Sequence, residues 1–114
     1  MLTVEIFNKG ELYERYMGDI VVIKEVIEIF IKSVEEKMDL LAKAIEKKDF
    51  NSIKFNAHSI KGQAYNMSAK KLGDIALDIE RAIKESDIEK IKILFDELSL
   101  SFLEVKDILV NTKF

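Results

Sequence analysis

Residues 49–67 read Asp-Phe-Asn-Ser-Ile-Lys-Phe-Asn-Ala-His-Ser-Ile-Lys-Gly-Gln-Ala-Tyr-Asn-Met, and this stretch decides how the whole chain is interpreted. Its apolar residues recur at steps of four and three, at Ile53, Ala57, Ile60, Ala64 and Met67. That spacing describes one face of an α-helix, which we expect to be buried. His58, the single histidine of the chain, lies about 140° around the helix from the middle of that face. The pattern therefore predicts an imidazole that faces water.

The helical neighbours of His58 are two lysines, a glycine and a tyrosine. Lys54 and Lys61 lie about one turn before and after it, followed by Gly62 and Tyr65. Glycine inside a helix costs about 0.8–1.0 kcal/mol relative to alanine, so Gly62 needs a reason to be there. Without a side chain it would leave one flank of the ring open to a second protein. The lysines supply positive charge suited to a phosphoryl oxyanion beside the ring.

Composition restricts the chain to one all-α domain, residues 1–114. The 114 residues contain no proline, four glycines and 34% charged residues, which leaves little material for turns or long loops. The absence of cysteine excludes disulfides, zinc-cysteine sites and thiol nucleophiles. A single histidine excludes a multi-histidine metal site, and we expect no metal.

Charge and hydropathy exclude further classes. A net charge of −3 argues against nucleic acid as a partner. No run of 18 uncharged apolar residues is present, so we expect no membrane span. The N-terminus lacks a basic region followed by an apolar segment, so we expect no secretion signal and a cytoplasmic protein.

Helical spacing continues on both sides of the histidine stretch. A short helix is expected over about Thr3 to Met17, lying across one end of the bundle. Gly18 breaks the chain, and Asp19 is the expected N-cap of a long helix that extends to about Lys48. Its apolar positions are Ile20, Ile23, Ile27, Phe30, Val34, Met38, Leu41 and Ile45.

Two further helices follow the histidine helix, which Asp49 or Asn51 can cap. Ser68 is the expected N-cap of the next, whose apolar residues are Leu72, Ile75, Ala76, Ile79 and Ile83. Gly73 either allows close helix approach there or is simply tolerated. Asp87 caps the last helix, with Ile91, Leu94, Phe95, Leu98, Phe102, Val105 and Leu109 buried. Short links predict an antiparallel up-down-up-down four-helix bundle over about residues 19–110, with a short additional N-terminal helix.

One segment of the chain reads Ala57-His58-Ser59-Ile60-Lys61-Gly62-Gln63-Ala64-Tyr65-Asn66-Met67-Ser68-Ala69, and it is followed by Leu72 and by the pair Ile79-Glu80. This pattern resembles the histidine-containing phosphotransfer (HPt) domains of two-component phosphorelays. One position departs from the family pattern, because the family usually has glycine where this chain has Ser68. A helix junction tolerates serine well, so this puts little of the chemistry in doubt. The resemblance extends loosely over nearly the whole chain.

The resemblance implies a role for each residue near His58, which would carry the phosphoryl group. Glu80, beside core residues of the neighbouring antiparallel helix, would orient the imidazole through one ring nitrogen and leave Nε2 to attack. An ordinary solvated glutamate is the alternative. Lys61 would screen the phosphoryl charge; Lys54 and Lys84 could add to it or belong to a solvated face. Gln63 points away from the ring, and Asn66 serves the helix end rather than the chemistry.

Two aromatic residues, Phe55 and Tyr65, flank His58 on its outward side. Exposed aromatics there suggest a surface on which a partner docks, although either could pack under the N-terminal segment instead. The partners implied by the resemblance are response-regulator receiver domains, a hybrid sensor histidine kinase, or both.

The sequence thus predicts a monomeric phosphocarrier that is not an enzyme. It would accept a phosphoryl group from a receiver aspartate and pass it to another receiver. No ATP-binding motif is present, the chain needs no cofactor, and Mg²⁺ is expected on the partner receiver. Alternatives are the phosphorylated domain of a chemotaxis-type histidine kinase, a helical adaptor that carries no phosphate, and a purely structural bundle.

Overall fold

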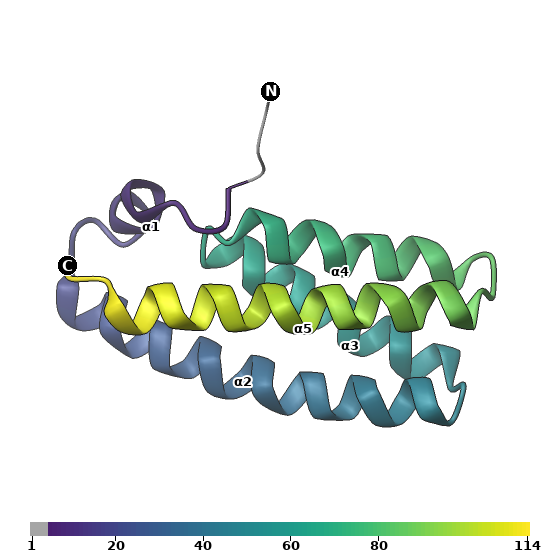
Figure 1. Ribbon diagram of the computed structural model, residues 1–114. Helices are drawn as coiled ribbons and strands as arrows, with labels where there is room; N and C mark the ends of the chain where they lie inside the picture. Colours follow the sequence, from purple (N-terminus) through teal and green to yellow (C-terminus); the bar gives the residue numbers. More distant parts are fainter. Residues whose placement is uncertain (1–4) are drawn as a thin grey trace.

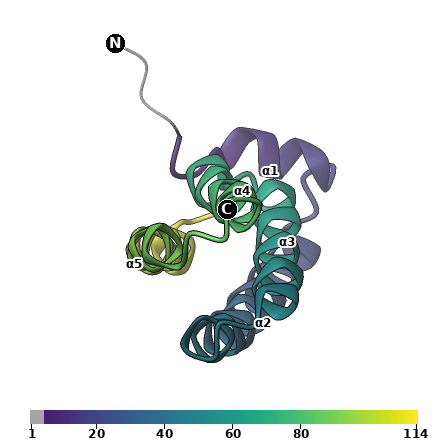
Figure 2. The same cartoon turned by 90° about the vertical axis from the view of Figure 1, so that its right-hand side faces the viewer.

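Five helices make up the part of the chain described by the computed structural model, residues 5–114 (Figure 1). The helices are α1 (Lys9–Arg15), α2 (Ile20–Glu46), α3 (Phe50–Asn66), α4 (Lys70–Ile83) and α5 (Ile88–Asn111). Seen end-on, α2, α3, α4 and α5 follow one another around a bundle, and α1 lies outside it on the side of α3 and α4 (Figure 2). The expected all-α bundle with an extra N-terminal helix is confirmed.

Short links make consecutive helices antiparallel. Each of the three links between the long helices has one residue with positive φ, at Lys48, Ser68 and Ser86, and the next residue is the N-cap. Asp49 and Asp87 cap α3 and α5 by accepting a hydrogen bond from the backbone N–H three residues on. Asp19 caps α2 in the same way, as expected.

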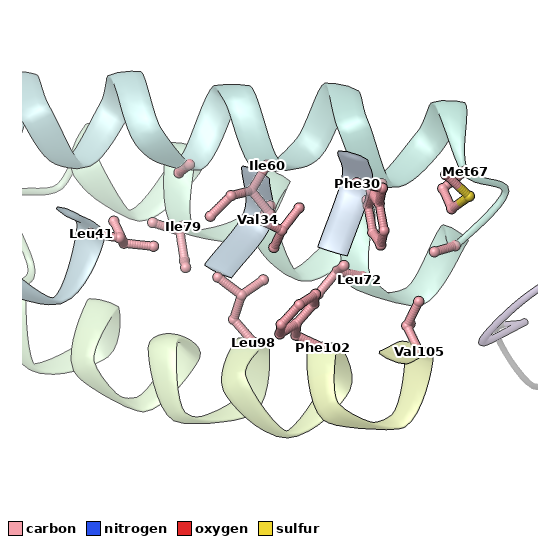
Figure 3. Packing of buried hydrophobic residues seen from close by; sticks show 14 of the residues in the cluster. Phe30, Val34, Leu41, Ile60, Met67, Leu72, Ile79, Leu98, Phe102 and Val105 are labelled. Atoms are coloured by element: carbon pink, nitrogen blue, oxygen red, sulfur yellow. The ribbon is translucent and has the colours of Figure 1, made fainter. Parts of the chain in front are cut away.

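The core lies on the axis of the bundle and draws its residues from all four long helices (Figure 3). Phe30 of α2 and Phe102 of α5 meet edge to face, with ring centroids 6.3 Å apart. On α3 the buried apolar residues are Ile53, Ala57, Ile60 and Ala64, the face that the spacing predicts. Burial of this stripe determines which side of α3 remains in solvent.

The N-terminal helix is shorter than expected. The predicted segment begins at Thr3, which lies outside the described residues, and α1 itself covers only Lys9–Arg15. Asn8 caps it by accepting from the N–H of Glu11. Its one fully buried residue is Leu12, so a single side chain connects α1 to the apolar core.

Ser68 is not the N-cap of α4, which corrects the expectation. Ala69 occupies that position and has no side-chain cap. Instead, the backbone N–H of Lys71 donates to the carbonyl oxygen of Glu5 at 3.0 Å, so the segment before α1 caps α4.

The side chain of Ser68 instead ties the α3–α4 turn to α1. The Ser68 residue has φ +59° and is 5% exposed. Its hydroxyl accepts from Arg15 and donates to Glu11, both at 2.8 Å, and Arg15 also contacts Glu11 at 3.1 Å. The hydrogen bond from Ser68 lowers the pKa of the Glu11 carboxyl most, and the hydrogen bond from Arg15 lowers it further. A serine thus adopts a backbone conformation that favours glycine, and its hydroxyl joins α1 to the bundle.

Candidate phosphotransfer site on helix α3

His58 lies in the middle of α3, on the side opposite the buried stripe. Its side chain is 69% exposed, as the periodicity predicts. The residue before it, Ala57, is fully buried, because consecutive helical residues differ by about 100° in direction. A packed helix therefore presents the imidazole to solvent from a rigid backbone.

Glu80 of α4 lies directly beside the histidine. Its Oε1 atom is 3.3 Å from His58 Nδ1, and its side chain is 16% exposed. The Glu80 Oε1 atom accepts no hydrogen bond from the described residues, so it interacts with His58 through proximity and charge. A carboxylate next to Nδ1 favours the tautomer that carries its proton there, which leaves the lone pair on Nε2.

Lys61 also contacts Glu80. Its Nζ lies 2.9 Å from the same Oε1 atom, and its side chain is only 20% exposed. The ammonium group therefore offsets the charge of the half-buried carboxylate. The expected role of Lys61 toward a phosphoryl group stays a prediction, because in this structure its charge is directed at Glu80.

Gly62 leaves space beside the histidine. A Cβ atom built on Gly62 would meet no heavy atom within 4 Å, so no contact within the described residues requires glycine there. The flank of the imidazole on this side is accordingly open to a visiting molecule, as expected.

Three cations share the lining of one cavity with Glu80. Lys54 and Lys84, both exposed, line a cavity of about 190 Å³ together with Glu80 and Arg81. Arg81 was not among the residues expected from the sequence, and its guanidinium group lies 3.8 Å from the Asp78 carboxylate. Its position three residues before Lys84 on the same helix face was the signal that could have identified it. The structure thus adds one cation beside the site.

Phe55 stands in solvent next to the histidine. The Phe55 residue is 67% exposed and lies three residues before His58, hence on the same face of α3. Lys37 of α2 places its Nζ 5.2 Å from the centroid of the Phe55 ring.

Tyr65 departs from the expectation of an exposed ring. It is partly buried, its ring fills the space beside Gly73, and its hydroxyl donates to Asp74 at 2.7 Å. Partial burial, which is the larger cause, and this hydrogen bond together raise the pKa of Tyr65 to about 12. Tyr65 also lines a cavity of about 290 Å³ with Glu5 and Arg15, so it borders the N-terminal segment across that space. The contacts that bury its ring come from α4.

Gln63 and Asn66 contact neither His58 nor Glu80. Gln63 donates to Ser59 at 3.1 Å, and the backbone carbonyl of Asn66 accepts from Arg15. Residues 5–114 contain no cluster of three or more histidine, cysteine or acidic side chains that could bind a metal ion. Within the same residues, no helix is long and apolar enough to span a membrane.

A family model and a known relative each match most of this chain. The family model described as "Hpt domain" matches residues 25–108. The phosphorelay intermediate protein rdeA of Dictyostelium discoideum is 27% identical over 107 residues, which are 94% of this chain and 42% of that protein. The chain thus spans less than half the length of this curated relative.

A solved structure shares the fold. The histidine-containing phosphotransfer protein B (HptB) of Pseudomonas aeruginosa PAO1 superimposes with a TM-score of 0.87, over 95% of this chain and 94% of that chain, at 18% sequence identity. Because the family model covers most of the bundle, and the bundle presents one exposed histidine beside a carboxylate, this chain belongs to the Hpt domain family.

Proposed function

We propose that this chain is a phosphorelay intermediate that accepts a phosphoryl group on His58 from a receiver-domain aspartate and passes it to a second receiver. The observation that carries the proposal is the exposed imidazole with Nδ1 3.3 Å from Glu80 and an open flank at Gly62. Family membership and the similarity to rdeA, a phosphorelay intermediate protein, support it.

The transfer is a single displacement at phosphorus. The Nε2 lone pair attacks the phosphorus of the aspartyl phosphate, a P–N bond forms, and the P–O bond to the aspartate breaks. The aspartate leaves as a carboxylate, and the proton on Nδ1 stays beside Glu80, whose charge stabilises the cationic ring. Transfer to a second receiver is the reverse of this step.

The catalytic work is divided between two proteins. The receiver would supply the Mg²⁺ and most of the groups that stabilise the metaphosphate-like transition state. This chain would supply the nucleophile and its orientation, and Lys54, Lys84 and Arg81 add positive charge nearby. It would act as a carrier and not as an enzyme, and partner affinity should be modest because it must release each receiver.

A labelling experiment tests the proposal. Receivers encoded in the same genome are phosphorylated with labelled acetyl phosphate, freed of donor and mixed with this chain. We expect an acid-labile, base-stable label on the chain, and His58→Gln should remove it. Ser59→Ala, next to His58 on α3, is the matched control that should keep the label.

Two outcomes would contradict the proposal. Label that persists in His58→Gln would reject the site. Label that arrives only from an ATP-bound histidine kinase, and from no receiver, would favour the phosphorylated domain of a kinase instead.

A further inference from the structure

A lysine of the neighbouring helix contacts the aromatic ring of Phe55, three residues before His58. Lys37 is half-buried on α2, and its ammonium group lies 5.2 Å from the centroid of the Phe55 ring on α3. That distance is within the range of a cation–π contact. An otherwise exposed phenyl ring thus has one defined partner, which comes from a different helix.

Exposure of this ring requires an explanation, because the bundle does not use it for packing. Phe55 is 67% exposed and lies outside the apolar core, whereas Ile53, two residues earlier, is fully buried. The ring lies on the same face of α3 as His58 and Gly62. A protein that covers both the imidazole and its open flank would also meet the ring, because Phe55 and Gly62 lie on either side of His58 along one helix face.

The charges around Phe55 indicate what kind of partner surface its ring would contact. Lys37 lies against it, and Lys54, the residue before it, is exposed. Neither lysine has an ion-pair partner among residues 5–114, in contrast to Lys61, Lys70, Lys71 and Lys106. A surface with one apolar projection between two uncompensated cations is complementary to an apolar depression bordered by carboxylates.

We propose that Lys37 is a positioning residue that orients Phe55, and that the pair selects receiver domains with an apolar depression bordered by carboxylates next to their phosphorylated aspartate. This inference rests on the proposed function, since it names a determinant of partner choice at the same site. Lys37 does not touch the reacting atoms, so its effect should appear in binding and not in the transfer step itself.

Binding of an unphosphorylated receiver, followed by NMR titration, tests the pair without any chemistry. Removing the Lys37 charge while retaining its stem, in Lys37→Met, should weaken binding by up to about two- to fivefold, because the energy of one exposed cation–π contact limits how far the ring can be held in its binding orientation. It should also shift the ring signals of Phe55 in the free protein. Lys37→Arg should retain the receiver affinity and the Phe55 ring signals of the unaltered chain, because arginine also stacks on aromatic faces.

Two controls separate the effect of the Lys37–Phe55 contact from the effect of a change in net charge. Lys32→Met removes an exposed lysine from the same helix, so it changes the net charge equally and should leave binding and ring signals almost unchanged. In the double variant Lys37→Met/Phe55→Ala, the lysine change should weaken binding less than it does alone, because only its direct charge on the partner remains to be lost.

Several results would overturn the inference. It is wrong if Lys37→Met behaves like Lys32→Met, if the two losses multiply in the double variant, or if no receiver binds. Failure of phosphotransfer is a separate outcome, because His58→Gln should retain the difference between Lys37→Met and its control. At saturating receiver, the rate of transfer to His58 should be the same in Lys37→Met and the unaltered chain.

Discussion

The ring of Tyr65 on α3 occupies the space into which a Cβ atom at residue 73 of α4 would project. The two residues lie four positions on either side of Ala69, and His58 and Glu80 lie eleven positions on either side of it. In two antiparallel helices joined by a tight turn, such pairs are level with each other. The close approach at Gly73 and the contact at Glu80 therefore belong to one helix register.

Gly73→Ala should destabilise the protein even though alanine favours helix. The added methyl group collides with the Tyr65 ring, and overpacking costs about 1–3 kcal/mol, partly offset by about 1 kcal/mol of helix propensity. We expect a net loss of up to about 2 kcal/mol in the free energy of unfolding, measured with urea. In a Tyr65→Ala background the same change should be neutral or stabilising; an equal loss there would disprove the contact.

Gly62→Ala should have the opposite effect on stability. Because a Cβ atom at Gly62 meets nothing within 4 Å, the gain in helix propensity should raise the free energy of unfolding by about 0.8–1.0 kcal/mol. Transfer from a phosphorylated receiver should nevertheless slow, because the methyl group narrows the flank beside His58. Unchanged transfer kinetics would mean that the open flank has no role in docking.

Glu80→Ala should change the proton distribution on His58. Without the carboxylate near Nδ1, the population of the tautomer with its proton on Nδ1 should fall, which ¹⁵N chemical shifts of the imidazole report. Transfer should slow while the far-UV circular dichroism stays the same. Asp78→Ala, on the same helix and without contact to His58, is the control. If the tautomer ratio is the same in all three proteins, Glu80 does not orient the ring.

Ser68→Gly should be less damaging than Ser68→Ala. Both remove the hydroxyl that joins Arg15 and Glu11, but only glycine relieves the positive φ of 59°. We expect Ser68→Gly to be more stable than Ser68→Ala by about 1 kcal/mol. Both changes should also raise the pKa of Glu11, whose lowering comes first from Ser68. Equal stability of the two variants would show that this backbone conformation is not strained.

Alkaline pH should weaken the fold through Tyr65. Its pKa is raised from 10.0 to about 12 by partial burial and by the bond to Asp74, so the folded protein favours the neutral phenol. The resulting stabilisation is complete below pH 10 and is lost as pH rises from 10 through about 12. Ultraviolet titration against Tyr65→Phe isolates this group from the other two tyrosines. A Tyr65 midpoint near 10 would contradict the buried, hydrogen-bonded state.

Local rules were sufficient for the caps of α2, α3 and α5. Asp19, Asp49 and Asp87 each precede an apolar-periodic segment, and capping depends only on the few residues that follow. The same logic failed at Ser68, because a residue far away in sequence, Glu5, supplies the acceptor that caps α4. No local pattern contains that information.

The sequence by itself determined that His58 faces solvent, because helical periodicity assigns every residue of α3 to a buried or an exposed side. It also indicated Glu80 as the neighbour, through its place beside the core residues of the adjacent antiparallel helix and through the family resemblance. Only the tertiary structure decided that Tyr65 packs on Gly73, that Lys61 contacts Glu80, and that Lys37 reaches Phe55. The physical reason is that these contacts depend on the rotamers of long side chains and on the distance between helix axes, which spacing along the chain does not specify.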